Sequence, residues 1–200
     1  MKKFYKVSLI LLALSILVFN GCEDKTTDPP AVDNNFTFAK VGNKWTYKVT
    51  SESHISDMTQ EIIKDMGNHI YKVETIYQGA SFGTVYLFWY VNGEEISFNS
   101  DSTGISKNFM FDSSTEVNKT YMSIVEYSPF LQRGDTVYAK ILSLDESVTV
   151  PAGTFSCIKI QVWGGTTSSM SESMVYFNRK VGQIKQTSAQ MNLELKLKNF

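Results

Sequence analysis

The sequence predicts an all-β fold, mainly antiparallel: a single curved meander sheet forming a half-barrel or an open barrel, with at most short helices. From Lys44 onward, apolar and polar residues alternate with a period of two, which is typical of strands with one face buried and the other in water. Turn-forming residues, mostly glycine beside asparagine or aspartate, separate these runs at short intervals. No long stretch has the period of an amphipathic helix, so the strands are expected to form the whole domain.

Residues 1–21 have the layout of a secretory signal peptide. This segment carries three lysines, no acidic residue and the apolar run 7–19. As a helix, that run would measure about 20 Å, whereas the hydrocarbon core of a bilayer is about 30 Å thick. We therefore expect a cleaved signal peptide. The alternative is an uncleaved anchor followed by an ordinary cysteine.

A cysteine directly follows this segment, in the string Val18-Phe19-Asn20-Gly21-Cys22. The string resembles the lipobox of bacterial lipoproteins, in which a small residue precedes a cysteine that is acylated and becomes residue one. Phe19 and Asn20 depart from the commonest form of that pattern. The resemblance implies that Cys22 is the lipidation site and anchors the chain in the bacterial cell envelope, since two or more acyl chains make membrane attachment stable.

Residues 22–35 are expected to be the lipidated N-terminus and a flexible tether, and residues 36–200 the β domain. The tether has two adjacent prolines, four acidic residues and no periodicity. As a coil it would hold the domain on the order of 20 Å from the bilayer. The cluster Glu23-Asp24-Lys25 resembles acidic signals that send some bacterial lipoproteins to the outer membrane or the cell surface. The alternative is a solubilising spacer.

About ten short strands are expected in the domain. The strongest hairpin signal is Asn92-Gly93, which would join a strand over Thr84–Val91 to one over Glu94–Phe98. The segments Asp57–Lys64 and Asn118–Glu126 could form short helices. The clearest alternating runs are Trp45–Thr50, Tyr71–Tyr77, Ile158–Val162 and a last strand in which Met191, Leu193, Leu195 and Leu197 share one face.

The segment Val85–Val91 breaks the alternation, because it is apolar on both faces. One interpretation is a central strand that is covered on each side. The other is that its three even-numbered aromatic residues line a cavity on the side opposite Leu87 and Trp89, since tyrosine offers both apolar area and a hydroxyl. With two aromatic residues of the first strand, the candidate ligand-cavity residues are Tyr86, Phe88, Tyr90, Trp45 and Tyr47.

Three motifs occur in order at Val41–Tyr47, Val148–Ile160 and Val181–Lys185. Their Gly-Asn-x-Trp-x-Tyr, Pro-Ala-Gly-Thr-Phe and Val-Gly-x-Ile-Lys patterns resemble those of uncharacterised bacterial exported proteins. Some of these resemble the periplasmic lipoprotein-carrier fold, a curved antiparallel half-barrel that can wrap an acyl chain. The resemblance implies a fold, and its motifs specify turn geometry: Pro151 fixes φ and Gly153 permits a positive φ, as a hairpin requires.

Composition argues against several classes of function. Without residues 1–21, the chain has 16 basic and 20 acidic residues and no basic block, which disfavours nucleic-acid binding. With Cys22 expected to be acylated, one thiol and two histidines are too few for a four-ligand Cys/His zinc cage, and no cofactor motif is present. His54 and His69 lie in turn-like surroundings. Cys157 shares the parity of Lys159, which would allow partial exposure, but no Cys-x-x-Cys partner accompanies it, so a buried free cysteine is the favoured interpretation.

Two functions remain open at this stage. The first is a membrane-anchored envelope lipoprotein that binds a lipid or another apolar ligand in its concave sheet. The second is a structural or assembly lipoprotein that docks to an envelope protein. An enzymatic function is not expected: a hydrolase could be built around His54 only on paper, since no serine stands in a nucleophile motif.

Overall fold

The computed structural model describes residues 35–79, 83–100, 102–103, 108–112, 115–125, 132–164 and 172–200, with only the backbone given for residues 99, 100 and 108–110. The predicted signal peptide, Cys22 and nearly all of the tether therefore lie outside the described residues. Asn34–Phe200 forms one compact unit.

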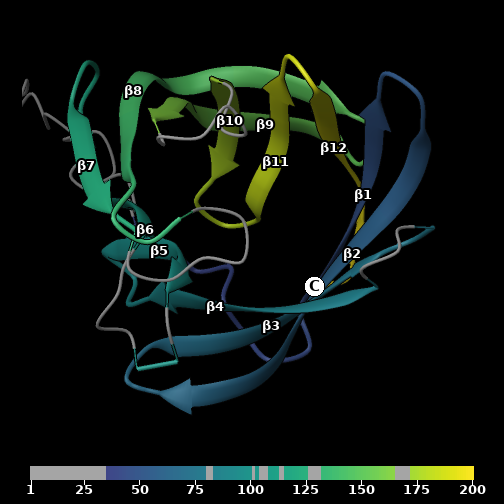
Figure 1. The fold of residues 1–200 in the computed structure, drawn as a ribbon, viewed down its shortest axis with the longest axis horizontal. Coiled ribbons are helices and arrows are strands. Elements are labelled where there is room, and N and C mark those ends of the chain that lie inside the picture. The colour runs from purple at the N-terminus through teal and green to yellow at the C-terminus, as the bar shows by residue number, and fades with distance from the viewer. Residues whose placement is uncertain are drawn as a thin grey trace, which may run out of the picture. The chain divides into compact units, whose positions relative to one another are not determined.

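The described residues form twelve strands in one antiparallel sheet, shown in Figure 1. The predicted all-β class and single meander sheet are confirmed, with two strands more than the ten expected. The strands are β1 (Lys44–Ser51), β2 (Ile55–Gly67), β3 (Ile70–Tyr77), β4 (Thr84–Val91), β5 (Glu95–Ser100), β6 (Asn108–Asp112), β7 (Thr120–Ile124), β8 (Thr136–Val150), β9 (Gly153–Gly164), β10 (Ser173–Asn178), β11 (Gly182–Ser188) and β12 (Met191–Lys198).

The order of the strands shows how the sheet curls into a nearly closed barrel. Among the described residues, strands that follow one another in sequence pair, except β6 with β7, and β1 also pairs with β12. The order therefore runs from β6 through β1 and β12 to β7. The two end strands, β6 and β7, approach each other but are not paired within the described part of the chain. This leaves one seam in the barrel.

Side chains connect β6 to β7 across this seam. The carboxylate of Asp112 accepts hydrogen bonds from Lys119 Nζ at 3.1 and 3.2 Å and from the Tyr121 hydroxyl at 3.0 Å. The hydrogen bonds with Tyr121 and Asp112 raise the pKa of Lys119. Charge-assisted hydrogen bonds therefore join the two end strands at Asp112.

The predicted hairpin at Asn92-Gly93 is confirmed. Asn92 Oδ1 accepts hydrogen bonds from the backbone N–H groups of Glu94 at 2.9 Å and Glu95 at 2.6 Å. Gly93 has a φ of +92°, a conformation that glycine adopts without steric penalty. The prediction of short helices over Asp57–Lys64 and Asn118–Glu126 is wrong, because these segments fall largely within β2 and β7. The first segment pairs with β3, and residues 120–124 of the second pair with β8, so the sheet overrides the weak local preference for helix.

A β-bulge in β12 changes which residues face the interior. Thr46 lies opposite Leu197 but Tyr47 lies opposite Leu195, so β12 has one extra residue between these pairs. Leu193 and Leu195 are buried as expected, whereas Leu197 is 62% exposed. The prediction that Leu197 continues the buried face is therefore wrong, because the bulge reverses the parity of the strand.

Candidate functional site

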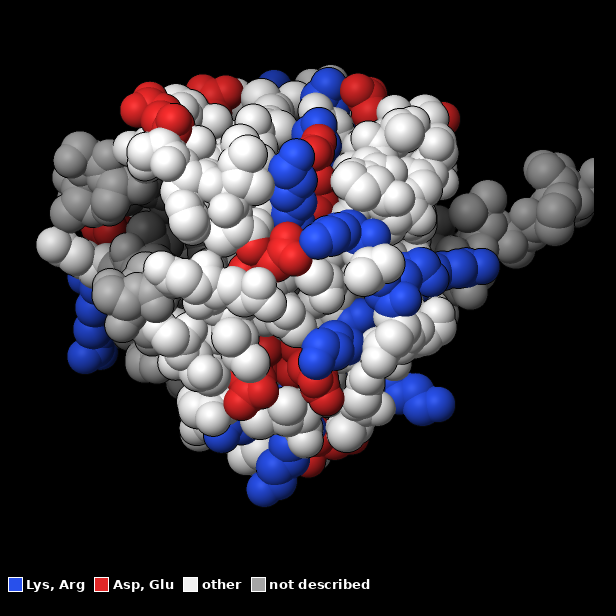
Figure 2. Space-filling model, turned by 90° about the vertical axis from the view of Figure 1, so that its right-hand side faces the viewer, with Lys and Arg blue, Asp and Glu red and all other residues white. Residues whose placement is uncertain are grey.

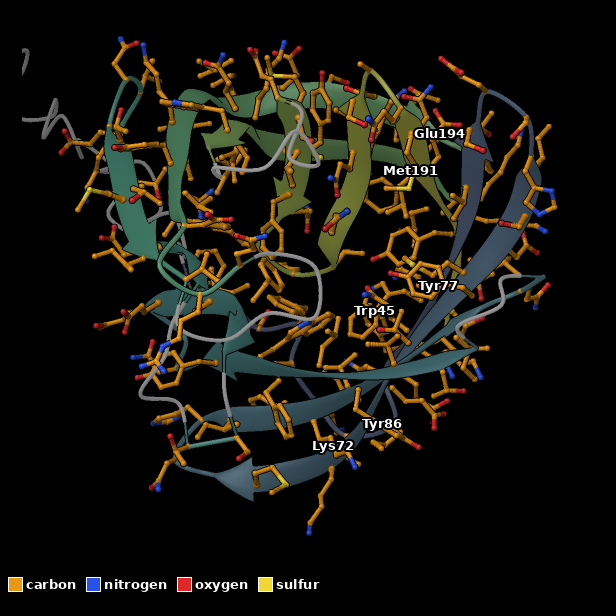
Figure 3. All side chains as sticks on the ribbon, in the orientation of Figure 1. Trp45, Lys72, Tyr77, Tyr86, Met191 and Glu194 are labelled. Atoms are coloured by element: carbon orange, nitrogen blue, oxygen red, sulfur yellow. The ribbon has the colours of Figure 1, made fainter. Side chains whose placement is uncertain are left out.

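The sheet places the five candidate cavity residues on two different faces. Trp45 and Tyr47 are each 1% exposed and point into the interior, on the same side as Leu87 and Trp89 of β4. Tyr86 is 46% exposed and lies on the outer face. Figure 3 shows Trp45 inside the barrel, and Lys72 and Tyr86 on the opposite side of β3 and β4. The structure thus does not bring the five residues together.

The polar atoms of Trp45 and Tyr47 bind backbone carbonyls across the interior. Trp45 Nε1 donates to the carbonyl of Val181 at 2.6 Å, and the Tyr47 hydroxyl donates to the carbonyl of Gln183 at 3.1 Å. Burial raises the pKa of Tyr47 well above its ordinary value. Both side chains therefore fasten β1 to the start of β11, and their hydrogen-bonding groups are already used within the protein.

Aromatic rings fill the interior around these two residues. Phe36 and Phe38, which precede β1, are 3% and 1% exposed. The Phe38 ring lies 5.3 Å from that of Phe177 and 6.0 Å from that of Trp89, both edge-on. The Trp45 and Trp89 rings lie 5.6 Å apart. Ring contacts at these distances are characteristic of a close-packed core.

On the outer face, the aromatic residues of β4 have local partners. Lys72 Nζ lies 4.0 Å from the centre of the Tyr86 ring, and the Tyr86 hydroxyl donates to Glu74 at 3.3 Å. Tyr90 accepts a hydrogen bond from Asn92 Nδ2 at 3.1 Å. Its cross-strand neighbours Ile70 and Ser97 are buried, so β4 is covered on both faces near Tyr90 and open to solvent near Tyr86.

The remaining thiol is buried. Cys157 is 1% exposed, because the pairing of β8 with β9 is irregular between Ser143 and Glu146 and Cys157 lies inside together with its neighbour Ile158. Burial, with a smaller contribution from the nearby Glu146, raises the pKa of the Cys157 thiol to about 12. The favoured interpretation, a buried free cysteine, is confirmed, and the half-exposed one is wrong.

The two histidines lie apart from one another in the fold. His54 is exposed in the turn between β1 and β2, where its carbonyl accepts a hydrogen bond from the Ser51 hydroxyl at 3.3 Å. His69 occupies the β2–β3 turn with a φ of +64° and lies edge-on to Tyr90. No group of three His, Cys, Asp or Glu side chains that could hold a metal ion occurs among the described residues. The same residues contain no helix able to span a bilayer.

A row of large side chains on the outer face of β7, β8 and β9 was not predicted. Met122 lies opposite Tyr138, and Tyr138 lies opposite Trp163. The two rings are stacked, with centroids 5.4 Å apart and planes at 16°. The parity of β9 could have revealed this row: if Ile160 and Val162 face the interior, Trp163 must face outward.

The opposite side of the barrel has a different character. On β1, β2, β11 and β12, lysines pair with acidic residues of neighbouring strands, and Figure 2 shows blue and red side chains alternating across this face. The distances from nitrogen to oxygen are 2.8 Å for Lys185–Glu194, 2.8 Å for Lys196–Asp57 and 3.2 Å for Lys44–Glu61. Such a surface is well suited to water.

Comparison with known proteins gives structural likenesses only. The chain matches no protein-family model and no curated protein. It is similar to the solved structure of a candidate lipoprotein from Parabacteroides distasonis, with a TM-score of 0.47 and 16% identity over 82% of this chain and 98% of that chain. It is also similar to a candidate exported protein with a YmcC-like fold from Bacteroides fragilis, with a TM-score of 0.48 and 11% identity over 83% of this chain and 99% of that chain.

Proposed function

We propose that this chain is a lipid-anchored protein of the bacterial outer membrane whose β domain acts by docking to an envelope protein. The observation that carries the choice of docking is the packed aromatic cluster: among the described residues, Phe38, Trp45 and Trp89 occupy the part of the interior next to β1 and β4. The outer face of β7–β9, in contrast, offers large side chains to solvent.

Support for the anchor comes from the sequence. Cys22 follows a short apolar run and a glycine, and the segment after it is rich in proline and acidic residues. Three acyl chains on such a cysteine would hold the domain at the membrane surface, where one chain alone binds only reversibly. The domain would then meet its partner at the membrane.

Two experiments test the proposal. Fractionation of cells should place the native chain in the outer membrane and a Cys22→Ser variant in the soluble fraction. Chemical crosslinking in intact cells should capture one dominant protein partner with the native chain. A Cys22→Ser variant that stays in the membrane fraction contradicts the anchor.

The alternative function, binding of an apolar ligand, is favoured by the resemblance to acyl-chain carriers alone. Mass spectrometry of the purified protein and displacement of a fluorescent fatty acid distinguish the two functions. If docking is the function, neither a bound lipid nor displacement is expected. A stoichiometric bound lipid would contradict docking as the main function.

A further inference from the structure

The first described residues show where the tether joins the barrel. Phe36 is 3% exposed, and its backbone N–H donates to the carbonyl of Gly93 in the β4–β5 turn at 2.7 Å. The backbone N–H of Thr37 donates to the carbonyl of Arg179 in the β10–β11 turn at 3.1 Å. The tether therefore enters the domain between these two turns, through the purple segment of Figure 1 that precedes β1.

The same segment ends in a tight turn that presents apolar side chains to solvent. The backbone N–H of Gly42 donates to the carbonyl of Ile62 at 2.8 Å, and that of Ile62 donates to the carbonyl of Asn43 at 3.0 Å. In this turn Val41 is 48% exposed, and beside it on β2 Ile63 is 37% exposed. Turns mostly carry glycine, proline or short polar residues, so an exposed valine here is unusual.

Cationic side chains line the path of this segment. Lys40 and Lys180 are exposed and Arg179 is partly buried. None of the three forms an ion pair within the described part of the chain, where the ion pairs use other lysines. Asn178 Oδ1 accepts a hydrogen bond from the backbone N–H of Lys180 at 2.9 Å, which fixes the β10–β11 turn. Residues 35–43 and the two turns thus hold three cationic residues and one acidic residue, Glu94.

Arg179 has a hydrogen-bonding group that the protein leaves unused. Among the described residues, its Nε is the one buried side-chain nitrogen or oxygen without a hydrogen-bond partner. Burial also lowers the pKa of its guanidinium, because the charged form loses hydration. Guanidinium groups bind phosphate oxygens through several N–H donors held in a rigid fork. A phosphate beside Arg179 would therefore offset the hydration that burial removes.

We propose that this rim, defined as Lys40, Val41, Ile63, Arg179 and Lys180, lies against the bilayer that anchors the chain and binds the phosphate groups of anionic lipids. The inference rests on the lipid anchor of the proposed function. It adds an orientation to that function, because the outer faces of the strands would then remain available to an envelope protein.

The length of the tether and the place where it ends favour lipid as the occupant of the rim. Residues 22–34 would span on the order of 20 Å as a coil, so the point where they join the barrel is held near the headgroups. Short tethers give effective concentrations in the millimolar range, so weak contacts are enough to close this distance. Each lysine or arginine near an anionic bilayer strengthens binding about five-fold, and exposed aliphatic side chains can enter the headgroup layer.

Fluorescence quenching by spin-labelled lipids tests the orientation. The full chain, acylated at Cys22, is placed in vesicles of phosphatidylethanolamine and phosphatidylglycerol, with a fluorophore attached to Val41→Cys. The matched control carries the fluorophore at Ile55→Cys, which is 64% exposed. Ile55 begins β2, about 23 Å along the strand from Ile62, to which the turn of Val41 is hydrogen-bonded. Lipids spin-labelled near the headgroup should quench the Val41→Cys probe at least five-fold more than the control.

Sedimentation with the same vesicles tests the binding of phosphate groups. The Cys22→Ser chain is used here, because no acyl chain then holds it to the lipid. Lys40→Gln with Lys180→Gln should lower its partition into the vesicles about 25-fold at low salt, and much less in 1 M salt or with uncharged lipid. The control, Lys48→Gln with Lys140→Gln, removes the same charge from the outer faces of β1 and β8 and should lower the partition by less than about three-fold.

Other outcomes overturn the inference in distinguishable ways. Equal quenching of the two probes in a chain that stays anchored would refute the orientation and leave the anchor standing. Equal partition of the two double variants would refute the binding of lipid phosphate. A Val41→Cys probe that is already shielded without vesicles would show that the acidic tether covers the rim, and one that crosslinks to an envelope protein would make the rim the docking surface. A native chain that is not held in the membrane fraction would contradict the proposed function itself.

Discussion

Replacing Phe38 by alanine tests the claim that the interior is filled. Phe38 is 1% exposed, and its ring contacts three others edge-on, those of Trp45 at 6.2 Å, Trp89 at 6.0 Å and Phe177 at 5.3 Å. A buried Phe→Ala substitution lowers the free energy of unfolding by about 3–5 kcal/mol, through lost transfer energy and the cavity left behind. In a domain of this size each kcal/mol lowers Tm by about 2–4 °C, so we expect a fall of roughly 6–20 °C.

Thermal unfolding with and without benzene provides the assay. The Phe38→Ala variant should contain an apolar cavity, and cavities of this kind stay dry and bind benzene. Benzene at 100 times its dissociation constant would stabilise the variant by about 2.7 kcal/mol, which is roughly 5–11 °C in Tm. The native chain, whose interior is already occupied, should show no comparable rise.

The control is Phe200→Ala. Phe200 also contacts Trp45, at 5.2 Å between ring centroids, but it is 46% exposed. Its loss should lower the free energy of unfolding by only about 1 kcal/mol, with no gain from benzene. The reasoning is refuted if benzene stabilises the native chain as much as the Phe38→Ala variant. The interior would then hold an apolar cavity before any mutation, and ligand binding would become the better-supported function.

Four further outcomes are expected from other contacts in the fold. Tyr47→Phe removes the hydrogen bond to the carbonyl of Gln183 and should lower the free energy of unfolding, measured by urea titration at pH 7, by about 1–2 kcal/mol. The control Tyr86→Phe, on the outer face, should change it by less than about 0.5 kcal/mol. Because burial raises the pKa of Tyr47 above 10.0, its hydroxyl ionises more readily in the unfolded chain; stability should fall as pH rises above about 10, and less steeply in Tyr47→Phe. The Cys157 thiol, with a pKa of about 12, should react with iodoacetamide at pH 8 only after unfolding, and rapid labelling of the folded chain would contradict its burial. Asp112→Ala removes the hydrogen bonds that this carboxylate accepts from Lys119 and Tyr121 at the seam. It should lower the free energy of unfolding by about 1–2 kcal/mol and speed amide exchange in β7, whereas Asp57→Ala, which removes the Lys196 pair, should lower it by under about 1 kcal/mol.

Much of the fold follows from patterns that are local in the sequence. Ile158, Ile160 and Val162 are buried as their period of two predicts, and the Asn92-Gly93 turn joins the strands on either side of it. These features depend on neighbouring residues only: side chains alternate between the faces of a strand, and glycine tolerates the positive φ of the turn.

Departures from this pattern come from bulges, which the sequence does not mark clearly. Leu197 and Cys157 each lie next to an irregular pairing, and each has the burial opposite to that predicted from parity. A bulge inserts one residue and reverses every face assignment beyond it. Neither position has a glycine or a proline that would signal the insertion.

The candidate site could be predicted only in part, because closure of the sheet decides which face of each strand becomes the interior. The sequence correctly separates Tyr86 and Tyr90 from Trp89 by parity, but it does not indicate which face becomes the interior. In a flat sheet Trp45 of β1 and Trp89 of β4 would lie three strands apart, about 14 Å across the sheet, and four residues out of register along it. Their rings are 5.6 Å apart, because the sheet curls toward this face. The direction of that curl places Trp45 and Trp89 in the core and leaves Tyr86 and the row of large side chains on β7, β8 and β9 on the outside. The choice between holding a ligand inside and docking outside therefore depends on curvature and not on the aromatic pattern itself.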